Sequence, residues 1–376
     1  METLVIASRD RANVLFIGKR FYTNRDTLED AYGRIYQLPH TWAAEKIRTR
    51  LWLIDYRGSK SLSRSDDALP IRSTPVTSGA FAGEIGRLLL TSSDITHVVA
   101  SGDCYIGLLG YLAAKRLKAS FIFDVYDKYD DFIGYRSPPG FKLFNFLLKR
   151  ADHRLFASAA LLKQLVGCQS RNILVPNGID YSRFYPREIA TCRKELKLVG
   201  DTRIIGYFGG MEADRGVEDL IEAVSLLRSQ GTGITLLLGG KSDGNINFDV
   251  PGVEYVGDVP YQDMPLMLGA CNLLAIPYRR SAIMDAGASN KIVEALACGR
   301  PIVATRTPNL VENFTQTAKR LDGRLAEPGE PGSIARAIQA QLDDPVLGDT
   351  PRGWGWSEIA LDTADQLGLS PDIDDD

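Results

Sequence analysis

Short apolar runs alternate with longer stretches whose apolar residues recur at helical spacing along most of the chain. A short apolar run bounded by turn formers is typical of a buried strand. The alternation predicts parallel strands covered by helices on both faces. The expected strands are 14–17, 51–54, 97–100, 120–123, 155–157 and 172–176 in the first half, and 204–208, 234–238, 253–256, 273–276 and 302–304 in the second. The expected helices include 217–229, 262–270, 290–298 and 332–342.

The strands fall into two groups, which are separated by the stretch VPNGIDYSRFYP at 175–186. This stretch is dense in the turn formers Pro, Asn, Gly and Asp, and it therefore marks a boundary. Two groups in 376 residues predict an α/β chain with two doubly wound, Rossmann-like domains. We expect the first domain at 1–178, the second at 179–350, and a C-terminal segment at 351–376 with one helix and an acidic tail. Ligands are expected at the carboxyl ends of the strands and between the domains.

The composition is that of an ordinary globular protein, with 44% hydrophobic and 24% charged residues. No apolar run approaches the ~20 residues that span a bilayer, and the N-terminus lacks the pattern of a signal peptide. The five cysteines are scattered without a CxxC pair, which favours reduced thiols in a cytoplasmic protein. Because the three histidines also lie far apart, no metal-binding motif is visible and no metal or cofactor is expected.

The charge is unevenly distributed along the chain. Residues 1–180 contain 25 lysines and arginines against 18 acidic residues, whereas the remainder contains 19 against 29. The first half should therefore attract an anionic partner, such as a diphosphate-linked acceptor or an anionic membrane face. The alternative is that surface charges are distributed unevenly without a role in binding. No nucleic-acid-binding signature is present, so nucleic acid is not an expected partner.

The stretch 275–305, AIPYRRSAIMDAGASNKIVEALACGRPIVAT, carries the strongest chemical signal. Its beginning completes a strand that Pro277 stops, and its end is another strand. A helix lies between them and is ended by Gly299 and Pro301. The polar loop that leads into this helix contains Arg279, Arg280, Asp285, Ser289, Asn290 and Lys291.

A helix N-terminus with cations beside it holds an anion, and phosphate is the usual one. Lys291 stands at this N-terminus, where the helix dipole disfavours a merely solvated lysine. Ser289 and Asn290 are expected to cap the helix, and Glu294, one turn further in, can accept hydrogen bonds from two ribose hydroxyls. The loop is therefore predicted to bind a nucleoside diphosphate.

The second half resembles the family 4 glycosyltransferases, which are retaining enzymes of the two-domain GT-B fold. The stretch IIGYFGGMEADRGVEDLIEAVSLL is similar to their first strand, glycine loop and helix, and NKIVEALACGRPIVAT to their most specific signature. The stretch VPNGIDYSRFYP is similar to the linker between their domains, and the C-terminal helix to one that crosses back to the first domain. The resemblance implies the GT-B fold and metal-independent transfer of a sugar from a nucleotide-diphosphate sugar to an acceptor hydroxyl.

The resemblance also implies roles for residues of the second half. Glu294 would bind ribose, while Lys291 and Arg215 would hold the diphosphate and stabilise it as it leaves. Gly209 and Gly210 end a strand, and they would let the backbone approach the donor. Asp285 would contact the donor sugar, although it is offset by one position from the acid of the family pattern.

Two further departures concern the cations and the acceptor. The family's glycine loop usually continues with Arg where this chain has Gly210, so Arg215 is the loop's cation, and Arg279 or Arg280 are alternatives for the missing one. Many members use a histidine in the first domain, but the corresponding stretch here, VYDKYDDF, contains none. The candidates for contact with the acceptor are Asp127, Asp130, Asp131, Lys19, Arg20 and Tyr22.

Asp127 is the candidate acceptor base or acceptor-orienting group, since a base must lie within hydrogen-bond reach of the hydroxyl that it activates. Both groups of candidates also have a reading without a function. The acidic stretch at 124–131 could be a solvated turn, and the stretch at 18–26 an exposed basic loop. The stretch FKLFNFLLKR at 141–150 is expected to form a core-facing helix rather than to rest on a membrane.

These patterns together predict a retaining, metal-independent glycosyltransferase. Its donor would be a UDP- or GDP-sugar, and its acceptor a glycan or a lipid-diphosphate-linked molecule of bacterial envelope or exopolysaccharide assembly. It would work in the cytoplasm, with peripheral contact to the anionic inner membrane. The alternatives are a GT-B nucleotide-sugar epimerase or hydrolase, and a degenerate scaffold that only binds a sugar nucleotide.

Overall fold

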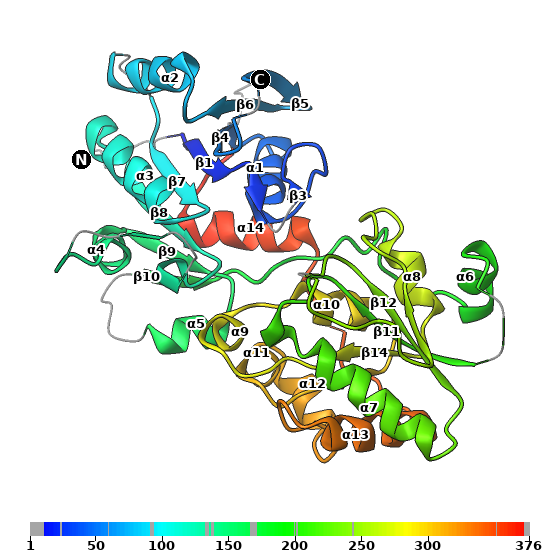
Figure 1. Ribbon diagram of the computed structural model, residues 1–376. Helices are drawn as coiled ribbons and strands as arrows, with labels where there is room; N and C mark the ends of the chain where they lie inside the picture. Colours follow the sequence, from blue (N-terminus) through cyan, green and yellow to red (C-terminus); the bar gives the residue numbers. More distant parts are fainter. Residues whose placement is uncertain are drawn as a thin grey trace, which may run out of the picture. The chain divides into compact units, whose positions relative to one another are not determined.

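The computed structural model describes residues 11–371, except 23–24, 59, 91–93, 132–134, 137–138, 166–170, 199, 201, 243 and 351 (Figure 1). The chain divides into two compact units. The first unit comprises Met1–Ala157, Leu165–Gly178 and Trp356–Asp376, and the second comprises Ser158–Gln164 and Ile179–Gly355. The acidic end at 372–376 and Cys168 lie outside the described residues, and the other four cysteines are buried free thiols.

The first unit is built on an eight-stranded sheet with the order β10-β9-β8-β7-β1-β4-β6-β5. Its strands are parallel except for β5, which pairs antiparallel with β6. The strands are β1 (Asn13–Lys19), β4 (Arg48–Asp55), β5 (Leu62–Asp66), β6 (Leu69–Pro75), β7 (His97–Ser101), β8 (Ser120–Val125), β9 (His153–Phe156) and β10 (Arg171–Leu174), with β2 (Phe21–Tyr22) and β3 (Arg25–Asp26) as a separate antiparallel pair.

Three helices, α1 (Arg34–Ala44), α3 (Cys104–Leu117) and α4 (Leu143–Arg150), bury apolar residues against this sheet. Helix α1 packs on β4 and β1, where Trp42 meets Phe16 with 6.0 Å between ring centroids. Helix α3 packs on β7 and β8, with α2 and α4 beside it. The helices of this unit are α1 (Arg34–Ala44), α2 (Gly79–Leu90), α3 (Cys104–Leu117), α4 (Leu143–Arg150) and α14 (Trp356–Leu367), with the 3₁₀ turn η1 (Tyr129–Asp131). The expectation that 141–150 forms a core-facing helix is confirmed, because Leu143, Phe144, Leu147 and Leu148 of α4 are buried.

The second unit contains a five-stranded, fully parallel sheet with the order β13-β12-β11-β14-β15. Its strands are β11 (Arg203–Phe208), β12 (Ile234–Gly239), β13 (Val253–Tyr255), β14 (Leu273–Ile276) and β15 (Ile302–Ala304). The helices are α5 (Ala159–Gln164), α6 (Ile189–Glu195), α7 (Val217–Ser229), α8 (Met264–Ala270), α9 (Ala282–Ala286), α10 (Asn290–Ala297), α11 (Pro308–Val311), α12 (Thr315–Arg320) and α13 (Pro331–Asp343), with the 3₁₀ turn η2 (Ala213–Arg215). Helix α10 packs on β14 and β15, so its first turn is fixed beside the ends of the central strands.

The units differ in two places from a simple division of the sequence. Residues Ser158–Gln164 group with the second unit, because the side-chain oxygen Oδ1 of Asn313 accepts a hydrogen bond from the Ala159 N–H at 2.8 Å. The C-terminal helix α14 groups with the first unit (Figure 1). It packs along α1, where the Trp42 indole N–H donates to the Ala360 carbonyl at 2.7 Å.

Candidate functional site

Lys291 of the second unit lies against the backbone of Gly209, which follows β11. A Cβ atom placed on Gly209 would be 2.3 Å from Cε and 2.6 Å from Nζ of Lys291. Gly209 also has φ +135°, a conformation that side chains rarely adopt. Both the close approach of Lys291 and the positive φ therefore require glycine at 209. Because Gly209 has no side chain, the Lys291 ammonium can lie at the end of β11.

Tyr278 connects Lys291 to its surroundings. Its side chain is 1% exposed, and its hydroxyl lies 3.0 Å from Ser289 Oγ while accepting from Lys291 Nζ at 3.4 Å. The Arg215 guanidinium lies 5.4 Å from the centre of the same ring. Burial by itself raises the pKa of the Tyr278 phenol, but the positive charges of Lys291 and Arg215 outweigh that effect and lower it below its usual value of 10. Two cations thus meet over one buried phenol.

The loops that carry these residues approach each other closely. Arg215 ends η2, and Gly216 follows it with φ +70°. A Cβ atom on Gly216 would lie 1.9 Å from the Pro277 carbonyl oxygen, so only glycine allows this contact with the loop after β14. The contact holds Arg215 near Tyr278, and the Arg215 Nε also lies 3.3 Å from Glu212 Oε2.

The start of α10 corrects one expectation. Ser289 stands at the N-cap position, but its side chain makes no capping hydrogen bond. The reason is that Ser289 Oγ is engaged with the Tyr278 hydroxyl, while the Ser289 N–H donates to Asn309 Oδ1 at 3.2 Å. Asn290 is the first residue of the helix. Glu294 is half-buried and lies three residues after Lys291, so the two side chains are on the same side of the helix.

The remaining polar residues of this loop are held in ion pairs. Arg279 donates from Nε and Nη2 to the two carboxylate oxygens of buried Asp219 at 2.7 and 2.6 Å, which raises the pKa of Arg279. Arg280 Nε lies 2.9 and 2.8 Å from the two oxygens of Asp285. The geometry therefore favours Arg279 as a tie between the loop after β14 and α7, and Asp285 as an acid of α9 that Arg280 holds. Their expected roles in donor binding stay predictions.

In the first unit, Tyr22 and Asp127 come together at the carboxyl ends of β1 and β8. The Tyr22 hydroxyl donates to Asp127 Oδ2, and the Tyr22 ring meets the edge of Tyr126 with 4.7 Å between centroids. Burial, followed by the charge of Asp127, raises the pKa of Tyr22 well above its usual value. Tyr126 is fixed in turn, because its hydroxyl donates to the Gly102 carbonyl at 3.2 Å. Tyr22 and Asp127 thus form a hydrogen-bonded pair at this edge of the sheet.

The other expected acceptor residues are tied to partners within the unit. Arg20 is buried, and it donates to Asp26 at 2.9 Å, which supports a role in holding the β2–β3 pair. Both oxygens of Asp131 lie 2.7 Å from Lys128 Nζ, and Asp130 lies 3.9 Å from it.

Two nearby residues complete this picture of the first unit. Lys19 Nζ lies 3.6 Å from Asp103 Oδ2. Asp124, which lies within β8, is fully buried and paired with Arg34 at 2.7 Å. The structure thus brings Asp127 and Tyr22 together and assigns the other acids cationic neighbours.

Sequence reasoning missed Tyr278, Gly216 and Asp219, which position the expected cations. The signal for Tyr278 was present, since it directly follows Pro277 at the end of a buried strand. Asp219 gave no signal, because it lies 60 positions from Arg279 in the sequence. Within the described residues, no cluster of three or more His, Cys, Asp or Glu forms a metal site, and no helix is long and apolar enough to cross a membrane.

Comparison with known proteins bears on this site. Residues 202–344 match the family model described as glycosyl transferases group 1. The matched segment lies in the second unit. It includes Gly209, Arg215, Tyr278, Lys291 and Glu294, so all the residues gathered around Lys291 belong to it.

Curated relatives are similar to parts of the chain. A GDP-mannose-dependent phosphatidylinositol monomannoside mannosyltransferase of Corynebacterium glutamicum is 27% identical over 183 residues, which are 46% of this chain and 47% of that protein. The capsular polysaccharide biosynthesis glycosyltransferase CapM of Staphylococcus aureus is 24% identical over 46% of each chain. The chain thus spans about half the length of these curated relatives. Their shared description supports the expectation of a glycosyltransferase enzyme.

Solved structures are similar over nearly the whole chain. Sucrose-phosphate synthase of Thermosynechococcus elongatus superposes with a TM-score of 0.74 at 18% identity, covering 95% of this chain and 98% of that one. HepE of Anabaena, in complex with UDP, superposes with a TM-score of 0.68 at 17% identity over 95% and 100% of the two chains. These likenesses confirm the expected fold, which is α/β of the GT-B type.

Proposed function

We propose that this protein is a nucleotide-sugar-dependent glycosyltransferase whose donor binds to the matched segment of the second unit. The observation that carries the proposal is the placement of Lys291 on Gly209, with Arg215 and Lys291 over the buried ring of Tyr278. The diphosphate of a sugar nucleotide gains negative charge as the sugar leaves. Cations that are fixed before the reaction stabilise that charge without reorganising.

The finer proposal is a retaining, metal-independent transferase of family 4. Lys291, Arg215 and the first-turn N–H groups of α10 supply positive charge and hydrogen-bond donors, so the leaving diphosphate can be stabilised by the chain's own groups. Glu294 would accept from the ribose hydroxyls, and Asp285 would reach the donor sugar after releasing Arg280. The base of the donor would be uracil or guanine, because solved neighbours are complexes with UDP and UDP-glucose and one relative is GDP-mannose-dependent.

We further propose that the first unit receives the acceptor at Tyr22 and Asp127. The Asp127 carboxylate would accept the proton of the acceptor hydroxyl or orient that hydroxyl for attack. The acceptor would be a glycan or a lipid-diphosphate-linked molecule. One relative is named for capsular polysaccharide biosynthesis and another for a phosphatidylinositol monomannoside, which supports envelope or exopolysaccharide assembly. The place of action would be the cytoplasm, with peripheral contact to the cytoplasmic face of the membrane.

The alternatives are an epimerase or hydrolase that uses the donor alone, and a scaffold without activity. The relatives named above are transferases, and this does not favour either alternative. Donor turnover that is independent of any acceptor would support the epimerase or hydrolase.

The donor assignment predicts stabilisation by nucleoside diphosphates. We expect UDP or GDP at 100 times its Kd to stabilise the chain by about 2.7 kcal/mol, and to raise Tm by several degrees. Uridine and guanosine are the matched controls, and they should have little effect because they lack the phosphates that Lys291 and Arg215 would hold. A thermal-shift series makes the comparison. Equal shifts with nucleosides and diphosphates, or none with either, would contradict the assignment.

The acceptor assignment predicts that Asp127→Asn lowers sugar transfer by about 100-fold, since general bases contribute at least that much. The UDP-induced rise in Tm should be unchanged, because Asp127 belongs to the first unit. The matched control is Asp67→Asn, which removes an exposed carboxylate from the same unit. Transfer rates with purified glycan or lipid-linked acceptors provide the measurement, and full activity of Asp127→Asn would exclude this residue as base.

A further inference from the structure

The edge of the first sheet that carries Tyr22 and Asp127 extends beyond these two residues. In the strand order, β8, β7, β1 and β4 are neighbours, so the segments that follow their carboxyl ends lie along one edge. Asp127 follows β8, Tyr22 follows β1, and Arg57 follows β4. Neighbouring strands are about 4.8 Å apart, so about 14 Å separates the end of β8 from the end of β4. The proposed acceptor residues therefore occupy only part of this edge.

Two guanidinium groups lie on the Phe21 ring beside this edge. Arg57 Cζ is 4.4 Å from the ring centroid, and Arg20 Cζ is 5.0 Å from it. A cation is attracted to the face of an aromatic ring, and a guanidinium also stacks on it. The Arg57 side chain is exposed, yet Phe21 holds its charged end beside β2.

The two arginines differ in their anionic partners. Arg20 donates to both carboxylate oxygens of Asp26, from Nε at 3.2 and 3.1 Å and from Nη2 at 2.9 Å. Among the residues that the structure describes, no carboxylate pairs with the Arg57 guanidinium, and Asp55 accepts only from the Arg57 backbone N–H, at 2.7 Å. The guanidinium N–H groups of Arg57 can therefore donate to an anion that arrives from outside.

Tyr56 and Asp103 lie along the edge between Arg57 and the proposed acceptor residues, since Tyr56 follows β4 and Asp103 follows β7. The Tyr56 hydroxyl donates to Asp103 Oδ1 at 3.3 Å. Lys19 Nζ lies 3.6 Å from Asp103 Oδ2 and 5.4 Å from the centre of the Tyr56 ring. The negative charge of Asp103 is therefore balanced by Lys19, and Asp103 is not the anion that Arg57 would bind.

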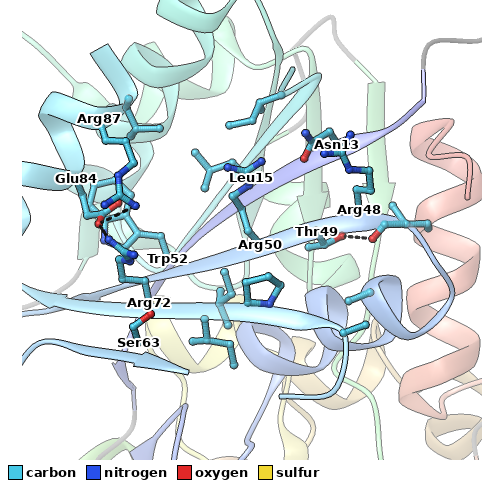
Figure 2. Close-up of a pocket in the computed structure, with 18 of the residues that line it drawn as sticks. Asn13, Leu15, Arg48, Thr49, Arg50, Trp52, Ser63, Arg72, Glu84 and Arg87 are labelled. Atoms are coloured by element: carbon cyan, nitrogen blue, oxygen red, sulfur yellow. Dashed lines mark hydrogen bonds and ion pairs between the residues drawn. The ribbon is translucent and has the colours of Figure 1, made fainter. Parts of the chain in front are cut away.

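Two other arginines of the same unit show the contrast. Arg48 and Arg72 line a cavity of about 670 Å³ beside β4 and β6 (Figure 2). Arg48 Nη1 lies 2.8 Å from Asp94 Oδ2, and Arg72 Nη1 pairs with Glu84. Each of these arginines has a carboxylate beside it, whereas Arg57 has an aromatic ring. A carboxylate balances the charge of an arginine, but an aromatic ring does not.

We propose that Arg57 binds the diphosphate of an acceptor in which a sugar is linked to a diphosphate. The inference rests on the proposed acceptor site at Tyr22 and Asp127, and it selects a diphosphate-linked acceptor over an uncharged glycan. With the acceptor hydroxyl at Asp127, a sugar together with its diphosphate spans the distance to the end of β4. The planar guanidinium presents paired N–H groups, which match the geometry of phosphate oxygens.

The test compares two acceptor analogues by titration calorimetry with the full chain. One is octyl glucoside, and the other is glucose joined to the same octyl group through a diphosphate. We expect the diphosphate compound to bind at least tenfold more tightly than octyl glucoside. Arg57→Ala should weaken binding of the diphosphate compound by about tenfold, as expected for the loss of a charge-assisted hydrogen bond, and should leave the affinity for octyl glucoside unchanged.

The matched control is Arg48→Ala, which removes another exposed arginine of β4's flanks and should leave both affinities unchanged. Arg57→Lys keeps the positive charge and should lose less affinity than Arg57→Ala. Full affinity of Arg57→Ala for the diphosphate compound, or no binding of that compound to the unmodified chain, would overturn the proposal. So would a loss of binding in Lys291→Ala alone, because the compound would then lie at the donor loop.

Kinetics separate this inference from the proposed function. Arg57→Ala should raise KM for a diphosphate-linked acceptor by about tenfold and change kcat little, because Arg57 would hold the acceptor away from the reacting hydroxyl. Equal KM values for the charged and uncharged acceptors would contradict this inference and leave the proposed transfer intact. Binding of the diphosphate compound through Arg57 without any sugar transfer would contradict the proposed function and leave the binding site intact.

Discussion

Replacement of Lys291 by alanine is expected to lower kcat/KM for sugar transfer by about 100- to 1,000-fold. The expectation follows from the loss of one preorganised donor to the leaving diphosphate, which is worth about 2.7–4 kcal/mol at comparable sites. Arg279 is not available to replace Lys291, since both oxygens of Asp219 bind it. Steady-state kinetics with UDP- and GDP-sugars provide the measurement.

Two further variants make the Lys291 experiment specific. Lys319→Ala removes an exposed lysine from α12 of the same unit and should leave the rate unchanged. Lys291→Arg should not restore activity, because the lysine is packed on Gly209 and the wider guanidinium does not fit that contact. Activity of Lys291→Ala within a few-fold of the unmodified chain would remove Lys291 from the site.

The largest expected effect on stability is that of Asp124→Ala in the first unit. Asp124 is fully buried, where it accepts from Arg34 Nε and Nη2 at 3.0 and 2.7 Å and from Ser101 Oγ at 2.6 Å. Removing the carboxylate leaves the buried guanidinium of Arg34 without its counter-charge. Breaking a buried ion pair in this way costs about 3–5 kcal/mol. Chemical denaturation followed by circular dichroism should show a lower midpoint for the first unit.

The control for Asp124 is an exposed acid that also faces an arginine. Glu29→Ala removes a carboxylate 3.7 Å from Arg64 at the surface of the same unit. Such surface pairs contribute about 0–1 kcal/mol, so the midpoint should hardly move. If Asp124→Ala and Glu29→Ala both leave the denaturation midpoint nearly unchanged, the Arg34–Asp124 pair does not stabilise the fold as we infer.

The strands and helices that were predicted from the sequence are those marked locally, by a short apolar run or by apolar residues at helical spacing. The run at 273–276 ends at Pro277, and the structure has β14 over the same four residues. Helix α7 likewise occupies the expected 217–229, because its apolar residues recur at helical spacing after Gly216. The hairpin of β5 and β6 was missed, since its first strand, LSRSD, alternates without a buried run.

The residues around Lys291 could be predicted only in part. Lys291, Arg215 and Gly209 were found because each stands beside a strand end or a helix start. The Tyr278 phenol that joins them was not found, because its position beside both cations depends on how the loop after β11 packs on the loop after β14. The same limit explains Ser289, whose sequence position predicts a cap while the neighbouring Tyr278 hydroxyl takes its side chain instead.

The return of α14 to the first unit has a consequence for biosynthesis. The first unit needs Trp356–Leu367 to cover α1, and the Trp42 indole N–H donates its hydrogen bond to the Ala360 carbonyl. Domains generally fold in the order in which they are translated. During synthesis, the side of α1 that carries Trp42 therefore stays uncovered until α14 has been made. The second unit, although made later, has all its strands and helices available sooner.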